Sequence, residues 1–552
     1  MNPNQLIECV PNFSEGRDMT IIRQITDEIE AVEGVRLLNV DPGKATNRTV
    51  VTFVGHPQGV LEAAFRAIRK AGELIDMSQH KGEHPRMGAT DVCPLIPVAH
   101  ISMEETAAYA QQLAKRVGEE LNLPVYLYEA AQEKKERSNL SVIRAGEYEG
   151  FFKKIKQPEW TPDFGPAVFD VKRGATVIGA RDFLVAYNVN LNTTSTRRAN
   201  AIAFDVREAG RNVVENGVKV NKPGSLKSVK AIGWFIEEFG IAQISINLTN
   251  LAVTPVHVAF DEVCKKAEAR GIRVTGSELV GLIPLQSMLD AGRYFLSKQQ
   301  RSVGVSEKEL IKIAVKSMGL DELYPFKPEE KIIEYMLRDK ADRKLVSMAL
   351  DEFADETASE SPAPGGGSIA AYIGSLGASL AAMVANLSSH KRGWDDRWEE
   401  FSRHAEKGQY FKDELLKMVD ADTRAFNGIM QAMGMPKSTD EEKTVRSRAI
   451  RDATRQAIEI PFRVMELAAE SMETIKAMAE TGNPNSVTDA GVGALCARSA
   501  VMGAFLNVRI NASGFEDTDF VNTIMAKGKA IEQRAMAMEK EILGLVNEKI
   551  GV

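Results

Sequence analysis

The 552-residue chain changes character near its middle, and this change limits the folds that it can adopt. Before Phe326, short runs rich in β-branched residues alternate with amphipathic segments of helical period. From Gly365 onward only three prolines occur, Pro436, Pro461 and Pro484, and Ala, Met, Leu, Glu, Lys and Arg dominate. Such residues favour helices. The sequence therefore predicts an α/β N-terminal half followed by an all-helical C-terminal domain.

The first half shows the order β-α-β-β-α-β twice. In the first round the strands lie in LIECVPNF, VRLLNVD, RTVVTFVG and VCPLIPVA, with helices over residues 18–32 and 57–76. The order recurs between FLVAYNVNLN and IRVTGSELVGLIP without clear residue-level similarity. This order is typical of ferredoxin-like sandwiches. We expect two such subdomains, joined around Asp163–Arg181, with a cleft for a small-molecule ligand between them.

These patterns divide the chain into four parts. They are an N-terminal α/β subdomain over residues 1–180, a second over 181–326, a charged linker over 327–340 and a helical domain over 341–552. Two helices of the last part are apolar nearly all round, so neighbours must cover them. A bundle that buries a further face in a dimer would do this, and so would an unusually full monomeric core.

Composition narrows the class of protein. Apolar residues make up 44% of the chain and charged residues 26%, which is ordinary for globular proteins. The formal charge of −7 does not suggest a nucleic-acid binder. The four scattered cysteines indicate a reduced compartment, and we find neither a signal peptide nor an apolar run long enough to span a bilayer. We therefore expect a cytoplasmic protein without a membrane partner.

The stretch HKGEHPRMGATDVCP, residues 80–94, concentrates chemically active side chains. His80 and His84 have a metal-binding spacing, but Gly82 and Pro85 disfavour the helix that it needs, and we predict no metal site. A single histidine can instead act as general acid and base near neutral pH. The alternative is a loop histidine that bonds only to a carbonyl group.

A second polar cluster lies in VDPGKATNRTVVTFVG. Asp41 ends one predicted strand and Arg48 begins the next, and loop carboxylates at strand ends are favoured catalytic positions. A solvated hairpin, in which Asp41 and Asn47 only stabilise turns, remains open.

These segments, with IECVPNFSEG, AGEYEG, EWTPDFGP, GARDFLVAYNVNL, AIGWF and GSELVGLIP, resemble the glutamate formimidoyltransferase family over most of residues 1–326. The resemblance implies transfer of a formimino group from N-formimino-L-glutamate to N5 of tetrahydrofolate. It places the catalytic acid/base on His84 and a pterin-side carboxylate on Asp41. Arg48, Arg86, Arg173 and Arg181 are candidates for binding substrate carboxylates.

The resemblance also implies a folate-binding segment in GPAVFDVKRG. Its residues are Gly165, Pro166, Ala167, Val168, Phe169, Asp170, Val171, Lys172, Arg173 and Gly174.

The helical half carries two further motifs. SPAPGGGSIAAYIG joins a glycine-rich lead to an apolar helix, which can form an anion-friendly helix N-terminus or simply allow close helix packing. In LLKMVDADTRAFNGIM, Asp420 and Asp422 lie two residues apart, so they point to different faces of a helix. Asp422 falls near Met418, Val419, Leu415 and Phe426, where burial could raise its pKa and make it an acid. A salt bridge to Arg424 is the alternative.

SPAPGGGS, VDADTRAF, NPNSVTDAGVGA and FLNVRIN resemble the formiminotetrahydrofolate cyclodeaminase family over most of residues 340–552. This implies closure of formiminotetrahydrofolate to 5,10-methenyltetrahydrofolate with release of ammonia, and Asp422 as the catalytic acid/base. The two resemblances together imply a bifunctional enzyme of histidine degradation that uses polyglutamylated tetrahydrofolate as co-substrate, with no metal and no nucleotide.

The resemblance further implies a homo-oligomer, such as an octameric ring of dimers, with cyclodeaminase sites near a dimer interface. Channelling of the intermediate between the sites is a hypothesis. Two rivals remain: a transferase whose helical domain is inactive or acts as a methenyltetrahydrofolate cyclohydrolase, and a folate-binding scaffold without catalysis.

Overall fold

A computed structural model describes residues 5–44, 46–82, 85–215, 218–338 and 343–551. The chain forms two compact units, and each is described by itself. One unit contains the residues up to Pro284 together with Gly319–Met336, and the other contains Leu285–Met318 with the residues from Leu337 onward. These units divide the chain differently from our expected boundaries, because residues 285–318 belong with the helical unit.

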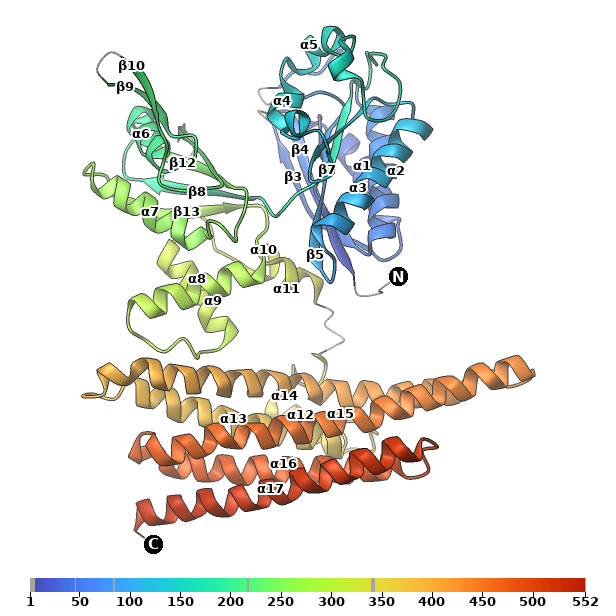
Figure 1. The fold of residues 1–552 in the computed structure, drawn as a ribbon, viewed down its shortest axis with the longest axis vertical. Helices are drawn as coiled ribbons and strands as arrows, with labels where there is room; N and C mark the ends of the chain where they lie inside the picture. Colours follow the sequence, from blue (N-terminus) through green and yellow to red (C-terminus); the bar gives the residue numbers. More distant parts are fainter. Residues whose placement is uncertain (1–4, 45, 83–84, 216–217, 339–342, 552) are drawn as a thin grey trace. The chain divides into compact units, whose positions relative to one another are not determined.

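The first unit begins with a seven-stranded sheet (Figure 1). Its antiparallel part has the order β3-β4-β1-β5, the ferredoxin-like order, and β7 and β6 extend it in parallel beyond β5. The strands are β1 (Leu6–Cys9), β2 (Asn12–Phe13), β3 (Val35–Gly43), β4 (Arg48–Gly55), β5 (Thr90–Ala99), β6 (Val125–Glu129) and β7 (Thr176–Ala180).

Helices cover both faces of this sheet. Strand residues of one parity, such as Ile7, Phe53 and Leu95, pack in the core under α1 (Met19–Glu30), α2 (Pro57–Leu74) and α3 (Met103–Glu120). Residues of the other parity, such as Tyr126 and Val177, pack with α4 (Leu140–Arg144) and α5 (Glu147–Lys154). The alternation follows from the two-residue period of a strand.

Strand β7 corrects one prediction. We expected Asp163–Arg181 to join the two subdomains, but Thr176–Ala180 forms a fully buried strand between β5 and β6. A short apolar run that is buried on both faces is typical of a parallel strand. The connection between the two sheets is therefore residues 181–184.

The second sheet has four strands in the order β11-β12-β8-β13, which again is the ferredoxin-like order. These strands are β8 (Val185–Leu191), β11 (Val229–Ile236), β12 (Ile241–Leu248) and β13 (Val274–Val280), with helices α6 (Thr196–Val206) and α7 (Val256–Glu268). A separate hairpin of β9 (Arg211–Glu215) and β10 (Val218–Lys222), which we did not predict, follows α6. The unit also holds the short α10 (Pro328–Lys331). The predicted fold class of this half, two β-α-β-β-α-β subdomains, is confirmed.

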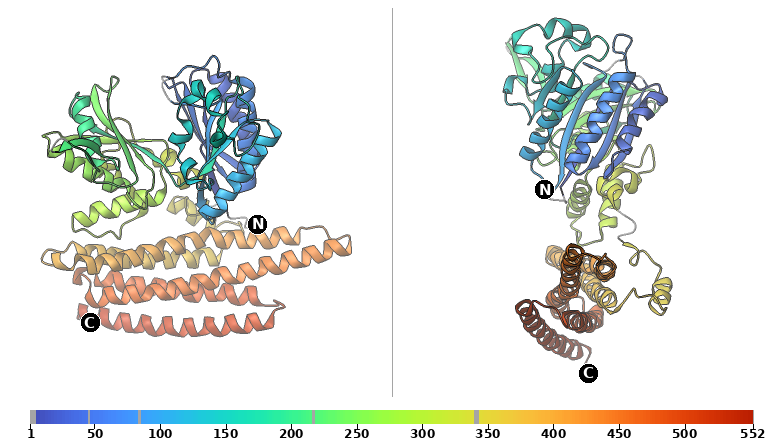
Figure 2. Two further views of the ribbon diagram at one scale, coloured as in Figure 1. Left: turned by 45° about the horizontal axis from the view of Figure 1, so that its top comes forward. Right: turned by 90° about the vertical axis from the view of Figure 1, so that its right-hand side faces the viewer.

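The second unit is helical, as predicted, and its long helices lie alongside one another (Figure 2). They are α13 (Gly366–Ser389), α14 (Trp398–Met433), α15 (Asp440–Thr481), α16 (Val487–Ala512) and α17 (Thr518–Ile550). The shorter helices are α8 (Leu285–Lys298), α9 (Glu307–Met318) and α12 (Leu350–Thr357), and α11 (Ile333–Leu337) lies at the division between the units.

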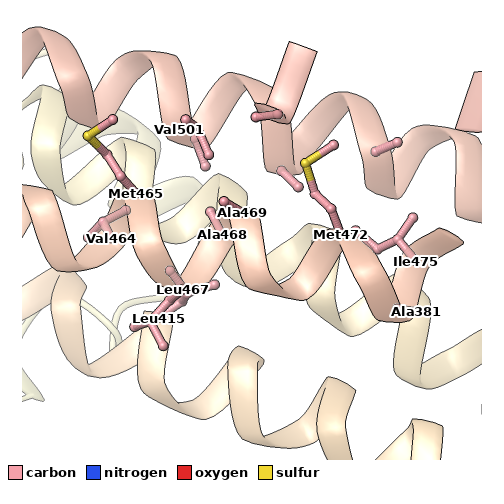
Figure 3. Close-up of a cluster of buried hydrophobic side chains, with 14 of the residues drawn as sticks. Ala381, Leu415, Val464, Met465, Leu467, Ala468, Ala469, Met472, Ile475 and Val501 are labelled. Atoms are coloured by element: carbon pink, nitrogen blue, oxygen red, sulfur yellow. The ribbon is translucent and has the colours of Figure 1, made fainter. Parts of the chain in front are cut away.

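The core of the bundle combines large and small side chains. Leu467 and Met472 of α15 are fully buried, and Leu415 of α14 and Val501 of α16 lie in the same cluster (Figure 3). Small residues let the backbones approach: a Cβ on Gly408 would lie 2.8 Å from the backbone nitrogen of Ala382. Such close packing requires a glycine at this position.

Helix α13 also corrects the statement that no apolar run could span a bilayer. By length and composition, α13 and the segment Pro484–Ala512 are both sufficient. However, 61% of the most apolar part of α13 and 50% of the most apolar part of Pro484–Ala512 are buried within the bundle. Burial of this kind is typical of the core helices of a folded bundle.

Candidate active sites

The loop between α2 and β5 carries the first motif. His84, the predicted acid/base, lies outside the described residues, as does Glu83. The residues on both sides of them are described, and they show what surrounds this loop.

Backbone hydrogen bonds attach both ends of the loop to the predicted folate segment, residues 165–174. The Met77 N–H donates to the Lys172 carbonyl, and the Ala89 N–H donates to the Arg173 carbonyl, both at 2.8 Å. The structure therefore brings together two motifs that are far apart in the sequence.

Two glycines make this contact possible. A Cβ on Gly88 would lie 2.3 Å from the Ala175 carbonyl oxygen. Gly174 has a φ of +71°, and a Cβ there would lie 2.2 Å from the Met87 carbonyl oxygen. Neither position has room for a side chain, so the loop and the folate segment pack backbone to backbone.

His80 is held by the protein on both ring nitrogens. The Arg86 Nε–H donates to Nδ1 at 3.3 Å, so Nε2 carries the proton and donates to the Asn47 carbonyl at 2.8 Å. Burial lowers the pKa of His80, which favours this neutral form. His80 therefore orders the loop.

Arg86 is also committed to the protein. It is buried, and its guanidinium pairs with Glu147 at 3.1 Å and with Glu149 at 2.6 Å. With the contacts to His80, these pairs use most of its donors. The geometry does not favour the predicted role of Arg86 in binding a substrate carboxylate.

A cavity of about 580 Å³ lies beside this loop. Its lining consists of Lys81, Gly82, Arg86, Gly146, Glu147 and Glu149. A cavity of this size can hold a small-molecule substrate.

Asp41 and Arg48 occupy neighbouring strands at one end of the sheet. Asp41 is exposed and pairs in register with Val50, two residues beyond Arg48 on β4. Burial lowers the pKa of Arg48, and the charges of Asp91 and Asp41 oppose this effect. The structure thus places the predicted carboxylate and arginine together.

Sequence reasoning missed Asp91 and Arg144. The carboxylate of Asp91 is fully buried; Oδ1 accepts from the Met87 N–H at 2.9 Å, and Oδ2 accepts from Arg144 Nη2 at 2.6 Å. Burial raises the pKa of Asp91, and the charges of Arg144 and Arg48 oppose this effect. Asp91 follows the HKGEHPRMG motif closely and could have been noticed in the sequence. Its partner Arg144 lies 53 residues later, so no local spacing indicates the pair.

The predicted folate segment presents two faces. Phe169 packs inward against Tyr148, with ring centroids 5.4 Å apart, and Arg173 pairs with Asp170 at 2.7 Å. Lys172 donates to the Glu73 carbonyl at 2.7 Å. The most exposed apolar side chains of the segment are Val168 and Val171.

Besides Arg86, two more of the four candidate arginines have partners within the described chain. Arg173 donates to the Leu121 carbonyl at 2.8 Å in addition to its bond with Asp170. Arg181 donates to the Asp182 carbonyl at 2.8 Å.

The second candidate site lies where α14 meets the first turn of α13. The Asp422 carboxyl is close to Gly367, where a Cβ would lie 2.1 Å from Oδ1. Ser368 Oγ donates to the Val419 carbonyl at 2.8 Å and lies 3.3 Å from Asp422 Oδ2. Burial raises the pKa of Asp422, and hydrogen bonds from Ser368 oppose this effect.

Asp422 has no ion pair within the described part of the chain, so the salt bridge to Arg424 that we considered is not the reason for its position. Leu415 and Val419 are buried beside it, whereas Phe426 is 42% exposed. The site is therefore apolar on one side and open on the other.

Asp420 has a different role. It is buried, and its two oxygens accept from the N–H groups of Leu345 and Val346 at 2.8 and 3.3 Å. It anchors the segment before α12 to α14. The expectation that Asp420 and Asp422 point to different faces is confirmed.

Family models match three parts of the chain. Residues 6–181 match the formiminotransferase domain, N-terminal subdomain; residues 186–338 match the formiminotransferase domain; and residues 349–530 match formiminotransferase-cyclodeaminase.

Curated relatives agree with these matches. The formimidoyltransferase-cyclodeaminase of Gallus gallus is 46% identical over 94% of this chain and 94% of its own length. The glutamate formimidoyltransferase of Thermoplasma acidophilum is 44% identical over 53% of this chain and 92% of its own length. The methenyltetrahydrofolate cyclohydrolase of Methylorubrum extorquens is 34% identical over 36% of this chain and 97% of its own length. The chain belongs to the formimidoyltransferase-cyclodeaminase family.

Proposed function

We propose that the chain catalyses two consecutive steps of folate chemistry. It transfers the formimino group of N-formimino-L-glutamate to tetrahydrofolate, which gives 5-formiminotetrahydrofolate and glutamate. It then closes this product to 5,10-methenyltetrahydrofolate and releases ammonia. The observation that carries the proposal is the match over nearly the full length of both chains to a relative named for both activities.

The transferase step needs proton transfer at nitrogen. The incoming amine loses a proton as it attacks the amidine carbon, and the leaving nitrogen gains one. A histidine can serve both transfers. We assign this role to His84, and we assign to Asp41 the stabilisation of the cationic nitrogen that forms. The attachment of the loop ends to residues 165–174 supports a folate site there.

The cyclodeaminase step needs an acid. N10 of the folate attacks the formimino carbon, and ammonia leaves only after its nitrogen is protonated. A carboxyl whose pKa is raised by burial stays protonated to higher pH and can donate this proton. We assign this role to Asp422.

A second function of the helical unit is favoured by one comparison. The match to a methenyltetrahydrofolate cyclohydrolase covers 97% of that protein. In that case the unit would hydrolyse the methenyl product and would release no ammonia. Ammonia and methenyltetrahydrofolate, measured together from supplied 5-formiminotetrahydrofolate, distinguish the two functions.

We also propose that the protein assembles as a homo-oligomer, with an octameric ring of dimers as the specific form, and that it acts in histidine degradation in the cytoplasm. Exposed apolar side chains on both small-residue helices support a covered face: Leu376, Met383 and Leu387 on α13, and Val492, Leu495, Leu506 and Ile510 on α16. Light scattering of the purified chain tests the assembly, and a monomer at micromolar concentration would overturn it.

A further inference from the structure

Arg144 has far fewer partners than its burial requires. Its side chain is only 14% exposed, and its one hydrogen bond within the described chain goes from Nη2 to Asp91 at 2.6 Å. Its Nε is buried and has no acceptor among the residues that the structure describes. A guanidinium has five N–H donors, and donors that are buried without acceptors cost free energy.

Two other buried arginines near this sheet, Arg86 and Arg137, have more acceptors in the protein than Arg144 has. Arg86 donates to Glu147, Glu149 and His80. Arg137 also has an unpaired Nε, but it donates to Asp163 and to the carbonyls of Glu159 and Thr161, and its guanidinium lies over the rings of Tyr126 and Trp160. Among the described residues, Arg144 has no comparable set of acceptors or rings.

The charges near Arg144 are compatible with the binding of one more anion. Arg48 and Arg144 both act electrostatically on the buried Asp91. Within the buried part of this cluster the two guanidinium groups face one carboxylate, Asp91, because Asp41, whose charge also acts on Arg48, is exposed to solvent. A carboxylate matches the free edge of a guanidinium in both charge and geometry.

The cluster lies next to the candidate catalytic loop. Asp91 bonds through one oxygen to Arg144 and through the other to the Met87 N–H, which belongs to the GEHPRMG motif. One buried carboxylate therefore fixes the arginine and the loop relative to each other.

We propose that Arg144, assisted by the charge of Arg48 and held by Asp91, binds the α-carboxylate of the formimino donor. This inference rests on the proposed transferase function. In N-formimino-L-glutamate the α-carboxylate is three bonds from the carbon that reacts, so it must bind beside the catalytic loop. The glutamyl carboxylates of a folate are separated from N5 by the aminobenzoyl group and do not meet this requirement.

The test compares Arg144→Gln and Arg144→Lys with the wild type in steady-state transfer. Both variants raise the KM for N-formimino-L-glutamate, by about 10- to 100-fold for Gln, because a charged and bidentate contact is lost. The KM for tetrahydrofolate stays within about twofold. Ammonia release from supplied 5-formiminotetrahydrofolate takes place at the candidate site of the other unit and is unchanged, and the retained KM for tetrahydrofolate shows that the unit with Arg144 is folded.

Arg137→Gln is the matched control, because Arg137 is at least as buried as Arg144 and is also paired with a carboxylate, Asp163. It leaves the KM for the donor unchanged. An equal increase in this KM for Arg137→Gln would show that Arg144 acts only through the fold, and would overturn the proposal.

Substrate analogues identify which carboxylate of the donor Arg144 binds. The wild type discriminates against the α-carboxamide analogue of the donor, and Arg144→Gln and Arg144→Lys discriminate against it less. Discrimination against the γ-carboxamide analogue is the same in all three proteins. Equal use of donor and α-carboxamide by the wild type, or a raised KM for tetrahydrofolate alone in the variants, would overturn the assignment. A wild type that transfers no formimino group would instead contradict the proposed function itself.

Discussion

The Asp422 carboxyl lies against the backbone of Gly367, in the first turn of α13. A Cβ at Gly367 would be 2.1 Å from Oδ1 and 2.6 Å from Oδ2. The glycine-rich lead of α13 therefore has a specific purpose at this position, which is to let a carboxyl from α14 approach the helix backbone.

Gly367→Ala should abolish ammonia release from supplied 5-formiminotetrahydrofolate, because the new methyl group must displace the Asp422 carboxyl. Formimino transfer should continue at the wild-type rate. Gly365→Ala is the matched control: the nearest atom to its Cβ is the Pro362 carbonyl oxygen at 3.8 Å, so both activities should remain. Full cyclodeamination by Gly367→Ala would show that the carboxyl need not be in this position.

Gly88→Ala should have the opposite effect. A Cβ there would lie 2.3 Å from the Ala175 carbonyl oxygen, so the histidine loop must separate from the folate segment. Transfer should fall by about 100-fold or more, since small displacements of catalytic groups are costly, while ammonia release is unchanged. Gly150→Ala has nothing within 4 Å of its Cβ and should keep both activities. Normal transfer by Gly88→Ala would contradict the role of this contact.

The cyclodeaminase rate should depend on pH through Asp422. Burial raises the pKa of this carboxyl, so its acid form persists to higher pH than that of an ordinary aspartate. A general acid must be protonated, so ammonia release should decrease as pH rises through this raised pKa. Asp422→Asn cannot donate a proton, and its residual rate, lower by about 100-fold or more, should lack this decrease. A retained alkaline decrease in Asp422→Asn would assign it to another group.

Glu8 makes a separate prediction about stability. Its side chain is 4% exposed, and burial raises its pKa from 4.5 to about 7. Between these values the unfolded chain loses the proton before the folded chain does, so stability falls as pH rises from 4.5 to 7. Glu8→Gln should remove this loss and raise stability at pH 8 by up to about 3 kcal/mol.

Thermal unfolding of the wild type and of Glu8→Gln at pH 5 and pH 8 tests this prediction. The variant should have the higher midpoint at pH 8 and nearly the same midpoint at pH 5. The exposed Glu119→Gln should change neither. A lower midpoint for Glu8→Gln at both values of pH would show that the ionised carboxylate stabilises the fold.

Local patterns predicted most of the fold. The strands and helices of both ferredoxin-like subdomains follow from periods of two and 3.6 residues, and the proline-poor half is helical as expected. Strand β7 was missed because a short apolar run beside glycines also fits a linker. The hairpin of β9 and β10 was missed although the sequence between the two strands contains Asn-Gly, a dipeptide that is a known hairpin signal.

The site was predicted less completely, for a physical reason. Asp422 was found because apolar neighbours on its own helix indicated burial. Gly367 comes from another helix, and Arg144 meets Asp91 across 53 residues, so no local spacing reveals either contact. Arg86 looked like a ligand for substrate, but its partners Glu147 and Glu149 lie more than 60 residues away.

The most direct test of the account is a time course with N-formimino-L-glutamate and tetrahydrofolate in which 5-formiminotetrahydrofolate, methenyltetrahydrofolate and ammonia are followed together. Asp422→Asn should consume the donor and accumulate 5-formiminotetrahydrofolate, and His84→Ala should form no intermediate. A mixture of the two variants should again produce methenyltetrahydrofolate and ammonia. If Asp422→Asn alone forms both products at the wild-type rate, the division of two consecutive reactions between two candidate sites is wrong.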